Sequence, residues 1–350
     1  MRAAVLYGVE DVRIEEVPKP ECPRDGLLLK VVACGICGTD ARTYFNGDER
    51  AKPPWILGHE VAGVVAEIGP EARQETDVRE GDRVHVISTL ACGRCEYCRM
   101  GLENLCVERG LLGYWPHPGG YAEYMPIARV ALRNVMKLPD DLPFEHATLI
   151  DPFSDALNGV ERLQVELGDT VVVIGAGPIG TLQAQVARAR GAFQVILVEI
   201  NEQRLARSRS ILGEDRMVYL SSGAGDTVEA VLSLTGGKGA ERIIVACSSG
   251  QAQEDALRMA KKRARIVYFG GLPKGKPTIQ FASNYLHYGE IEVTGAYASN
   301  YKQQYQALAM IHSGVIEAAK YITHILPLAE IAQGFEHIRR GESLKVVIKP

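Results

Sequence analysis

The sequence predicts an α/β protein with two domains, one rich in β-strands and one wound around a parallel sheet. Its 350 residues exceed one ordinary domain. The first 150 residues hold short β-rich runs between Gly- and Pro-containing turns, whereas apolar strands and helices alternate from Thr170 onward. The tail from about Tyr297 has further strands and helices that we expect to rejoin the first domain. We therefore place the β-rich domain at 1–153 and 297–350, and the second domain at 154–296.

The β-rich domain is expected to contain short strands and few helices. Helical periodicity first appears in FEHATLIDPFSDALNGVERL, which predicts a helix over 144–163. The strands predicted for this domain, including its C-terminal part, are 27–35, 61–69, 82–88, 121–127, 321–327 and 344–349.

The second domain is expected to alternate strands with helices. Such alternation implies right-handed crossovers and a parallel sheet with helices on both faces. The predicted strands are 170–175, 194–200, 217–220, 242–246, 264–270 and 291–296. The predicted helices are 178–191, 201–212, 226–236 and 252–262, so that the basic run Lys261-Lys262-Arg263 falls at a solvated helix end.

Charge and hydropathy narrow the class of partner. A formal net charge of −4 argues against a nucleic-acid surface, which is usually basic. No apolar run reaches the roughly 18 residues of a membrane span, and the charged N-terminus does not resemble a secretory signal. Eight cysteines in such a chain suggest reduced thiols and metal binding. We expect a cytoplasmic protein that binds neither nucleic acid nor membrane.

Four cysteines form the most distinctive motif. Cys92, Cys95, Cys98 and Cys106 are spaced C-x₂-C-x₂-C-x₇-C in a polar segment. Four thiolates so close in sequence can close a tetrahedron around one Zn²⁺, and a closed four-sulfur site is typical of structural zinc. A buried cysteine group, a redox pair and an iron–sulfur cluster are the alternatives, although cluster-binding runs have other spacings.

A glycine-rich run follows the first strand of the second domain. Gly175, Gly177 and Gly180 form G-x-G-x-x-G, with Pro178 and Ile179 between the last two glycines. The run lies between an apolar strand and a helix, which is the context that a dinucleotide-binding loop needs. The glycines allow a tight turn, close approach of the pyrophosphate and close helix–strand packing. A glycine turn without a nucleotide is the alternative.

The end of the next strand suggests which cofactor binds. Glu199 follows Gly180 by 19 residues, where a carboxylate can accept hydrogen bonds from the adenosine ribose and would repel a 2′-phosphate. Arg204 could stack on adenine or be an ordinary surface arginine. The sequence therefore favours NAD(H) over NADP(H).

Further metal-ligand residue types lie outside the four-cysteine segment. Cys37 occurs in ACGICGTDART and His59-Glu60 in ILGHEVAGVV. Each alone is more often structural than ligating, and Cys34-Gly-Ile-Cys37 could be a redox pair, although it lacks a thioredoxin-like βαβ setting. Spacing does not decide between these readings.

Taken together, these segments resemble the zinc-dependent medium-chain dehydrogenases, and closely their polyol (sorbitol-type) and threonine dehydrogenase branch. The resemblance covers essentially the whole chain and implies a GroES-like catalytic domain beside a Rossmann domain that binds NAD. The motifs that carry it, in chain order, are GICGTD, GHEVAGVVAEIG, GDRV, the four cysteines, GGYAEY, DPF, GAGPIG and the terminal KVVIKP.

The resemblance implies a second, catalytic zinc. Its ligands fall at Cys37 and His59, with Glu60 a ligand or near-ligand and Asp151 the next acidic position. Polyol dehydrogenases usually have Glu-Pro where this chain has Asp151-Pro152, and threonine dehydrogenases can have Asp-Pro. Aspartate is one methylene shorter, so direct ligation there needs a local shift or a bridging water.

The resemblance also implies roles for three residues near this zinc. Thr39 matches the Ser/Thr whose hydroxyl contacts the reacting oxygen, while zinc lowers the pKa of a substrate hydroxyl and hydride passes to the nicotinamide. Arg42 stands where many relatives have a histidine, which puts a proton relay through that position in doubt. Lys345, in the terminal motif, is expected to contact the cofactor.

Substrate and assembly remain open at this point. A secondary alcohol of a polyol or cyclitol is the leading expectation, with L-threonine the alternative. A non-catalytic zinc module that binds nucleic acid or a partner is a third hypothesis, against which the acidic net charge and the cofactor fingerprint argue. The resemblance implies a homodimer or homotetramer, with 291–296 as the edge strand that pairs between subunits.

Overall fold

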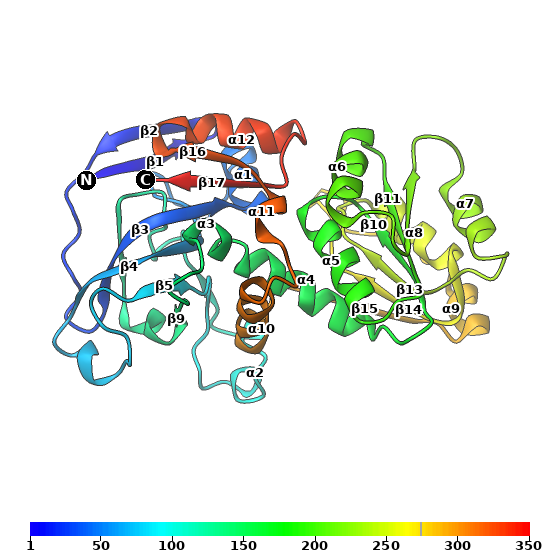
Figure 1. Ribbon diagram of the computed structural model, residues 1–350, viewed down its shortest axis with the longest axis horizontal. Coiled ribbons are helices and arrows are strands. Elements are labelled where there is room, and N and C mark those ends of the chain that lie inside the picture. Colours follow the sequence, from blue (N-terminus) through cyan, green and yellow to red (C-terminus); the bar gives the residue numbers. More distant parts are fainter. Residues whose placement is uncertain (274) are drawn as a thin grey trace. The chain divides into compact units, whose positions relative to one another are not determined.

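The computed structural model describes residues 1–273 and 275–350, which form two compact units (Figure 1). The first unit comprises Met1–Pro152 and Ser299–Pro350, and the second comprises Phe153–Ala298. Among the described residues, no helix is both long and apolar enough to cross a bilayer.

A mixed sheet forms the centre of the first unit. Its strands follow the order β16-β17-β3-β4-β5-β9, and β8 pairs with β3. They are β3 (Leu27–Ile36), β4 (Glu60–Ile68), β5 (Arg83–Val86), β8 (Tyr124–Ile127), β9 (Val135–Lys137), β16 (Ile322–Pro327) and β17 (Lys345–Lys349). Because β17 pairs antiparallel with β3, with Val347 opposite Gly35, the C-terminal segment is part of this unit. Two small two-stranded sheets pair β1 (Arg2–Gly8) with β2 (Asp11–Glu16), and β6 (Thr89–Leu90) with β7 (Gly110–Leu111).

The helices of the first unit are mostly short. They are α1 (Gly38–Asn46), α2 (Glu96–Arg99), α3 (Phe144–Ala147), α10 (Tyr301–His312), α11 (Ala318–Tyr321) and α12 (Ile331–Arg339), together with the 3₁₀ turns η1 (Ala72–Gln74), η2 (Glu103–Leu105), η3 (Arg129–Asn134) and η4 (Leu328–Glu330). The continuous helix predicted over 144–163 is wrong: α3 ends at Ala147, and α4 (Ile150–Leu163) begins anew. Pro152 explains the break, because proline lacks the amide donor of a helix interior and is tolerated in a first turn.

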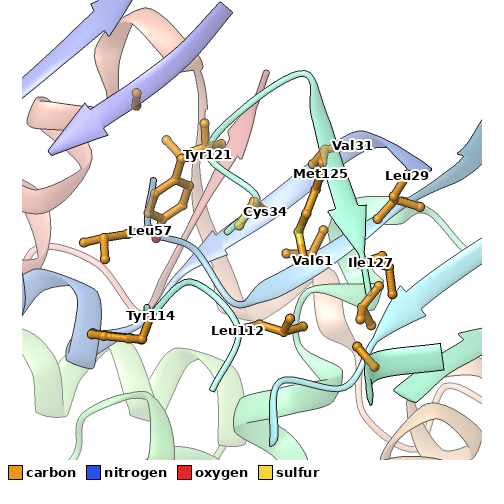
Figure 2. Packing of buried hydrophobic residues seen from close by; sticks show 14 of the residues in the cluster. Leu29, Val31, Cys34, Leu57, Val61, Leu112, Tyr114, Tyr121, Met125 and Ile127 are labelled. Atoms are coloured by element: carbon orange, nitrogen blue, oxygen red, sulfur yellow. The ribbon is translucent and has the colours of Figure 1, made fainter. Parts of the chain in front are cut away.

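Apolar side chains of this sheet and of the segments packed against it form the core. Figure 2 shows Cys34 inside this cluster beside Tyr121, and the Cys34 side chain has no exposed surface. Burial raises the pKa of its thiol well above the usual range. Cys34 is therefore a packing residue, which argues against the redox-pair reading of Cys34 and Cys37.

The second unit is a six-stranded parallel sheet with helices on both faces (Figure 1). The strand order is β12-β11-β10-β13-β14-β15, the order of a doubly wound dinucleotide-binding sheet, whose switch point lies between the first and fourth strands. The strands are β10 (Thr170–Ile174), β11 (Gln194–Glu199), β12 (Met217–Ser221), β13 (Ala240–Val245), β14 (Ala260–Tyr268) and β15 (Glu292–Gly295). The helices are α5 (Pro178–Ala189), α6 (Glu202–Leu212), α7 (Thr227–Leu234), α8 (Gly250–Arg258) and α9 (Ser283–Gly289).

Two elements of this unit differ from the sequence prediction. The helix expected over 252–262 ends at Arg258, and the basic run belongs to β14. Pairing with β13 overrides the local helical pattern: Ala260 lies opposite Ala240, and the Lys261 ammonium donates to Glu241 at 2.5 Å. Helix α9 was not predicted.

Candidate active site

Cys37 lies at the junction of a strand and a helix. It follows β3 and is the N-cap of α1, where its Sγ accepts the N–H of Thr39 at 3.4 Å. In return the carboxylate of Asp40 accepts the N–H of Cys37 at 3.4 Å, which completes a capping box. These two bonds fix the direction of the sulfur at the start of the helix.

A buried carboxylate orients His59. The Nδ1 atom of His59 lies 3.2 Å from Asp40 Oδ1, and the Tyr121 hydroxyl donates to Asp40 Oδ2 at 2.8 Å. Burial alone would lower the pKa of His59, but the adjacent Asp40 and Cys37 raise it well above the usual range. A carboxylate on one ring nitrogen sets the tautomer and orientation of a metal-ligating histidine. Asp40 is the last residue of the GICGTD motif, but no role was predicted for it from the sequence.

Glu60, the first residue of β4, is paired with Lys345. The Lys345 ammonium donates to Glu60 Oε2 at 2.5 Å and to the Ile36 carbonyl at 3.3 Å. Both side chains are buried, and Gly35 makes room for the carboxylate, because a Cβ there would collide with Glu60 Oε2. Burial would lower the pKa of Lys345, but Glu60 raises it, so the lysine stays charged. Contact between Lys345 and the cofactor stays a prediction.

Asp151 is held by donors from two other segments. The Ser88 hydroxyl donates to Asp151 Oδ1 at 2.8 Å, and the Gln304 amide donates to the same oxygen at 3.0 Å. The fully buried ring of His85 lies beside this group, and burial lowers the pKa of His85 to about 4 although Asp151 opposes the shift. His85 is therefore a neutral neighbour at pH 7. Neither Ser88 nor Gln304 carried a sequence signal.

The hydroxyl of Thr39 accepts a hydrogen bond from an arginine. Arg42 Nη2 donates to Thr39 Oγ1 at 3.1 Å, one turn along α1. A guanidinium has no acceptor and does not lose its proton in proteins. Arg42 therefore cannot accept a proton from Thr39, and the hydroxyl hydrogen of Thr39 remains for another acceptor.

The first unit thus gathers the predicted catalytic set. The charges of His59, Lys345 and Asp151 act on Glu60, and those of Cys37 and Asp151 act on Lys345. A thiolate, an imidazole and carboxylates form the usual donor set of catalytic zinc, so the residues fit this metal. Their ligand atoms are not drawn together as a compact cage, because one carboxylate faces Lys345 and the other faces Ser88 and Gln304.

The four-cysteine segment is a compact metal cage. In the described part of the chain, Cys92, Cys95, Cys98 and Cys106 are the set whose ligand atoms all lie within 4.8 Å of one another. Backbone N–H groups of Cys98 and Val107 donate to Cys95 and lower the pKa of its thiol to about 6. Four convergent sulfurs without an open position fit structural zinc. We call residues 92–106 the cysteine lobe.

The glycine loop of the second unit has the geometry of a phosphate-binding turn. Gly175 follows β10 with φ of +109°, a conformation that favours glycine. A Cβ at Gly180 would collide with the Gly175 carbonyl, whereas a Cβ at Gly177 would point into open space. Pro178 and Ile179 begin α5, so the loop presents a helix N-terminus and room for a pyrophosphate.

Glu199 ends β11 and closes onto this loop. Its Oε2 accepts the N–H of Ala176 at 2.7 Å, and its Oε1 accepts the N–H groups of Ile200 and Asn201, each at 3.0 Å. The carboxylate is therefore buried beside the loop with its orientation fixed. Arg204 lies in the first turn of α6, where its N–H donates to the Asn201 cap.

Comparison with known proteins matches both units. The model of the alcohol dehydrogenase GroES-like domain matches residues 23–140, and that of the zinc-binding dehydrogenases matches residues 178–313. The chain is 34% identical to a sorbitol dehydrogenase of Bombyx mori (99% of this chain, 97% of the relative) and 33% identical to an L-threonine 3-dehydrogenase of Pyrococcus abyssi (99% and 97%). A zinc-binding dehydrogenase of Sinorhizobium meliloti 1021, solved bound to NADP, superposes with a TM-score of 0.90 at 29% identity (100% and 99%).

The fold and the two metal-ligand sets thus define a zinc-dependent oxidoreductase with a nicotinamide cofactor. The chain belongs to the zinc-dependent medium-chain dehydrogenases, in the branch of the polyol and threonine dehydrogenases. The predicted fold class, a GroES-like domain with a Rossmann domain, is confirmed. The family assignment also argues against a non-catalytic zinc module.

Proposed function

We propose that this enzyme transfers hydride between a secondary alcohol of a polyol or cyclitol and NAD. The observation that carries this proposal is the gathering of Cys37, His59, Glu60 and Asp151 in the first unit, apart from the cysteine lobe. When bound, zinc supplies a Lewis acid that lowers the pKa of a hydroxyl, and NAD supplies the hydride acceptor.

Separate side chains bind the metal, orient its histidine ligand and contact the substrate. Cys37 and His59 hold the metal together with a carboxylate, and Asp40 keeps the His59 ring in one orientation. Thr39 hydrogen-bonds the reacting oxygen of the substrate. Because Arg42 occupies a lone pair of the Thr39 hydroxyl, the threonine proton points away from Arg42, and the product proton leaves by a route that does not end on this arginine.

A substrate panel tests the proposal. We expect NAD-linked oxidation of polyols or inositols, measured by NADH absorbance, to exceed that of simple primary alcohols, because several hydroxyls give more hydrogen bonds than one. The panel includes sugar phosphates and L-threonine. L-Threonine is the second candidate, since the relative from Pyrococcus abyssi is an L-threonine 3-dehydrogenase. Turnover confined to L-threonine would replace the polyol proposal.

Cofactor choice gives a second prediction. We expect kcat/KM to favour NAD⁺ over NADP⁺ by about 10- to 100-fold, because Glu199 repels a 2′-phosphate. Glu199→Gln should narrow this preference, whereas the same change at the exposed Glu202 should leave it intact. The Sinorhizobium meliloti structure was solved with NADP, so the opposite cofactor preference is a real alternative. A wild-type preference for NADP⁺ would reject the role given to Glu199.

We also propose a cytoplasmic homodimer or homotetramer. The four thiols of the cysteine lobe must be reduced to hold zinc, which suits a reducing compartment. Strand β15 is an edge of its sheet, and a cavity of about 340 Å³ beside it is lined by exposed Tyr285 and Tyr288. Light scattering measures the particle mass; a monomer at micromolar concentration would contradict the assembly.

A further inference from the structure

Two donors from separate segments bind one oxygen of Asp151. Ser88 follows β5, Gln304 lies on α10, and Asp151 is in the first turn of α4. The Ser88 hydroxyl and the Gln304 amide donate to Asp151 Oδ1 at 2.8 and 3.0 Å. The exposed fractions of the three residues are 5%, 1% and 6% for Ser88, Gln304 and Asp151, so water does not compete freely for these bonds.

The Gln304 amide is itself oriented. Its nitrogen donates to Ser299 Oγ at 3.2 Å as well as to Asp151, which uses both of its hydrogens. Turning the amide over would place its oxygen against the Asp151 carboxylate, which is unfavourable. The helix that carries Gln304 begins at a capping box formed by Asn300 and Gln303. The donor is therefore fixed before any ligand binds.

We propose that Ser88 and Gln304 are positioning residues that set the carboxylate of Asp151 as a ligand of the catalytic zinc. Holding one carboxylate oxygen at two points fixes the direction of the other. This restraint matters for aspartate, because its short side chain has few rotamers with which its carboxylate can reach a metal. The inference rests on the proposed zinc-dependent function and adds residues to the same site.

The other carboxylate of the set has a different restraint. Glu60 accepts a hydrogen bond from the charged ammonium of Lys345, whereas Ser88 and Gln304, which donate to Asp151, are neutral. A hydrogen bond from a cation is stronger than one from a neutral donor, so it competes more strongly with a metal for the carboxylate. The direct Lys345 bond therefore hinders metal binding by Glu60 more than Ser88 and Gln304 hinder metal binding by Asp151.

Zinc release tests the roles of Ser88 and Gln304. A chelator should remove zinc in two phases, with the cysteine lobe as an internal reference. Gln304→Met keeps the side-chain length and removes the donor, and Ser88→Ala removes the hydroxyl. Each should weaken the catalytic zinc by about 10- to 100-fold without changing the lobe phase, as expected when a ligand loses its hydrogen-bonding partner. The absorption of the Co²⁺-substituted site should shift as well.

Matched controls separate positioning from stability. Gln303→Met, on the same helix, removes a capping bond and keeps the Gln304 donor, and Ser343→Ala removes the hydroxyl of another buried serine. Gln303→Met should lower the melting temperature, whereas Ser343→Ala should leave it unchanged or raise it, because the buried Ser343 hydroxyl has no hydrogen-bond partner among the described residues. Neither control should change zinc release, and Ser88→Thr should restore the affinity lost in Ser88→Ala. Wild-type zinc affinity in both Ser88→Ala and Gln304→Met would overturn the proposal; Ser88→Ala decides alone if Gln304→Met does not fold. Zinc release does not depend on the substrate, so failure of the polyol panel remains a separate result.

Discussion

Replacing Cys37 with serine is expected to lower NAD-linked kcat/KM by about 1,000-fold. A metal centre supplies several kcal/mol of stabilisation to the reacting charge, and each 1.36 kcal/mol is a factor of ten in rate. Serine keeps the size of the side chain but removes the thiolate that follows β3 and caps α1. Steady-state kinetics with the best substrate of the panel measures the effect.

A second cysteine provides the control for this change. Cys22 lies outside both metal-ligand sets and is partly exposed, so Cys22→Ser should keep wild-type turnover. The zinc content of Cys37→Ser should fall by one equivalent while its thermal unfolding stays close to that of the wild type. Unchanged turnover in Cys37→Ser would remove the catalytic role from this site.

Replacing Cys95 with serine is expected to destabilise the protein before it affects the chemistry. Loss of a structural metal belongs to the mechanisms that cost about 4 kcal/mol or more of unfolding free energy. The helix of the cysteine lobe, α2, has four residues, too few for an independently stable helix. The lobe also contacts α10, where Tyr301 donates its N–H to Glu103 at 3.4 Å.

Calorimetry and limited proteolysis measure the loss of the lobe. The melting temperature of Cys95→Ser should fall, and trypsin should cleave after Arg94 or Arg99 within the lobe, with Cys22→Ser again as the control. Protein that kept its wild-type melting temperature and resisted trypsin would show that the four sulfurs are dispensable for stability.

Local sequence patterns predicted the strands and the turn that depend mainly on neighbouring residues. The parallel strands of the second unit are apolar runs in the sequence, and Gly175 and Gly180 indicate the turn of the glycine loop. The error at Lys261 arose because pairing with β13 determines that segment, and such pairing is not a local property. The break before Ile150 was foreseeable, since proline fits the first turn of a helix but not its interior, and Pro152 would lie in the interior of a helix over 144–163.

The site was predictable only in part. Family motifs indicated Cys37, His59 and Glu60 as catalytic-zinc residues, whereas the spacing of the four cysteines alone indicated a structural zinc site. The groups that orient these residues come from distant segments: Lys345 is 285 positions from Glu60, and Gln304 is 153 positions from Asp151. No single segment encodes such contacts, because they depend on how β17 and α10 return to the first unit.

Zinc release measured together with turnover separates the two metal sites. One zinc at Cys37 and His59 is expected to support hydride transfer, and a second zinc is expected to hold the cysteine lobe. Purified protein should contain two zinc equivalents, and NAD-linked activity should disappear as the chelator removes the first, while the second is still bound. Full activity after loss of the first equivalent, or in zinc-free protein, would contradict the account.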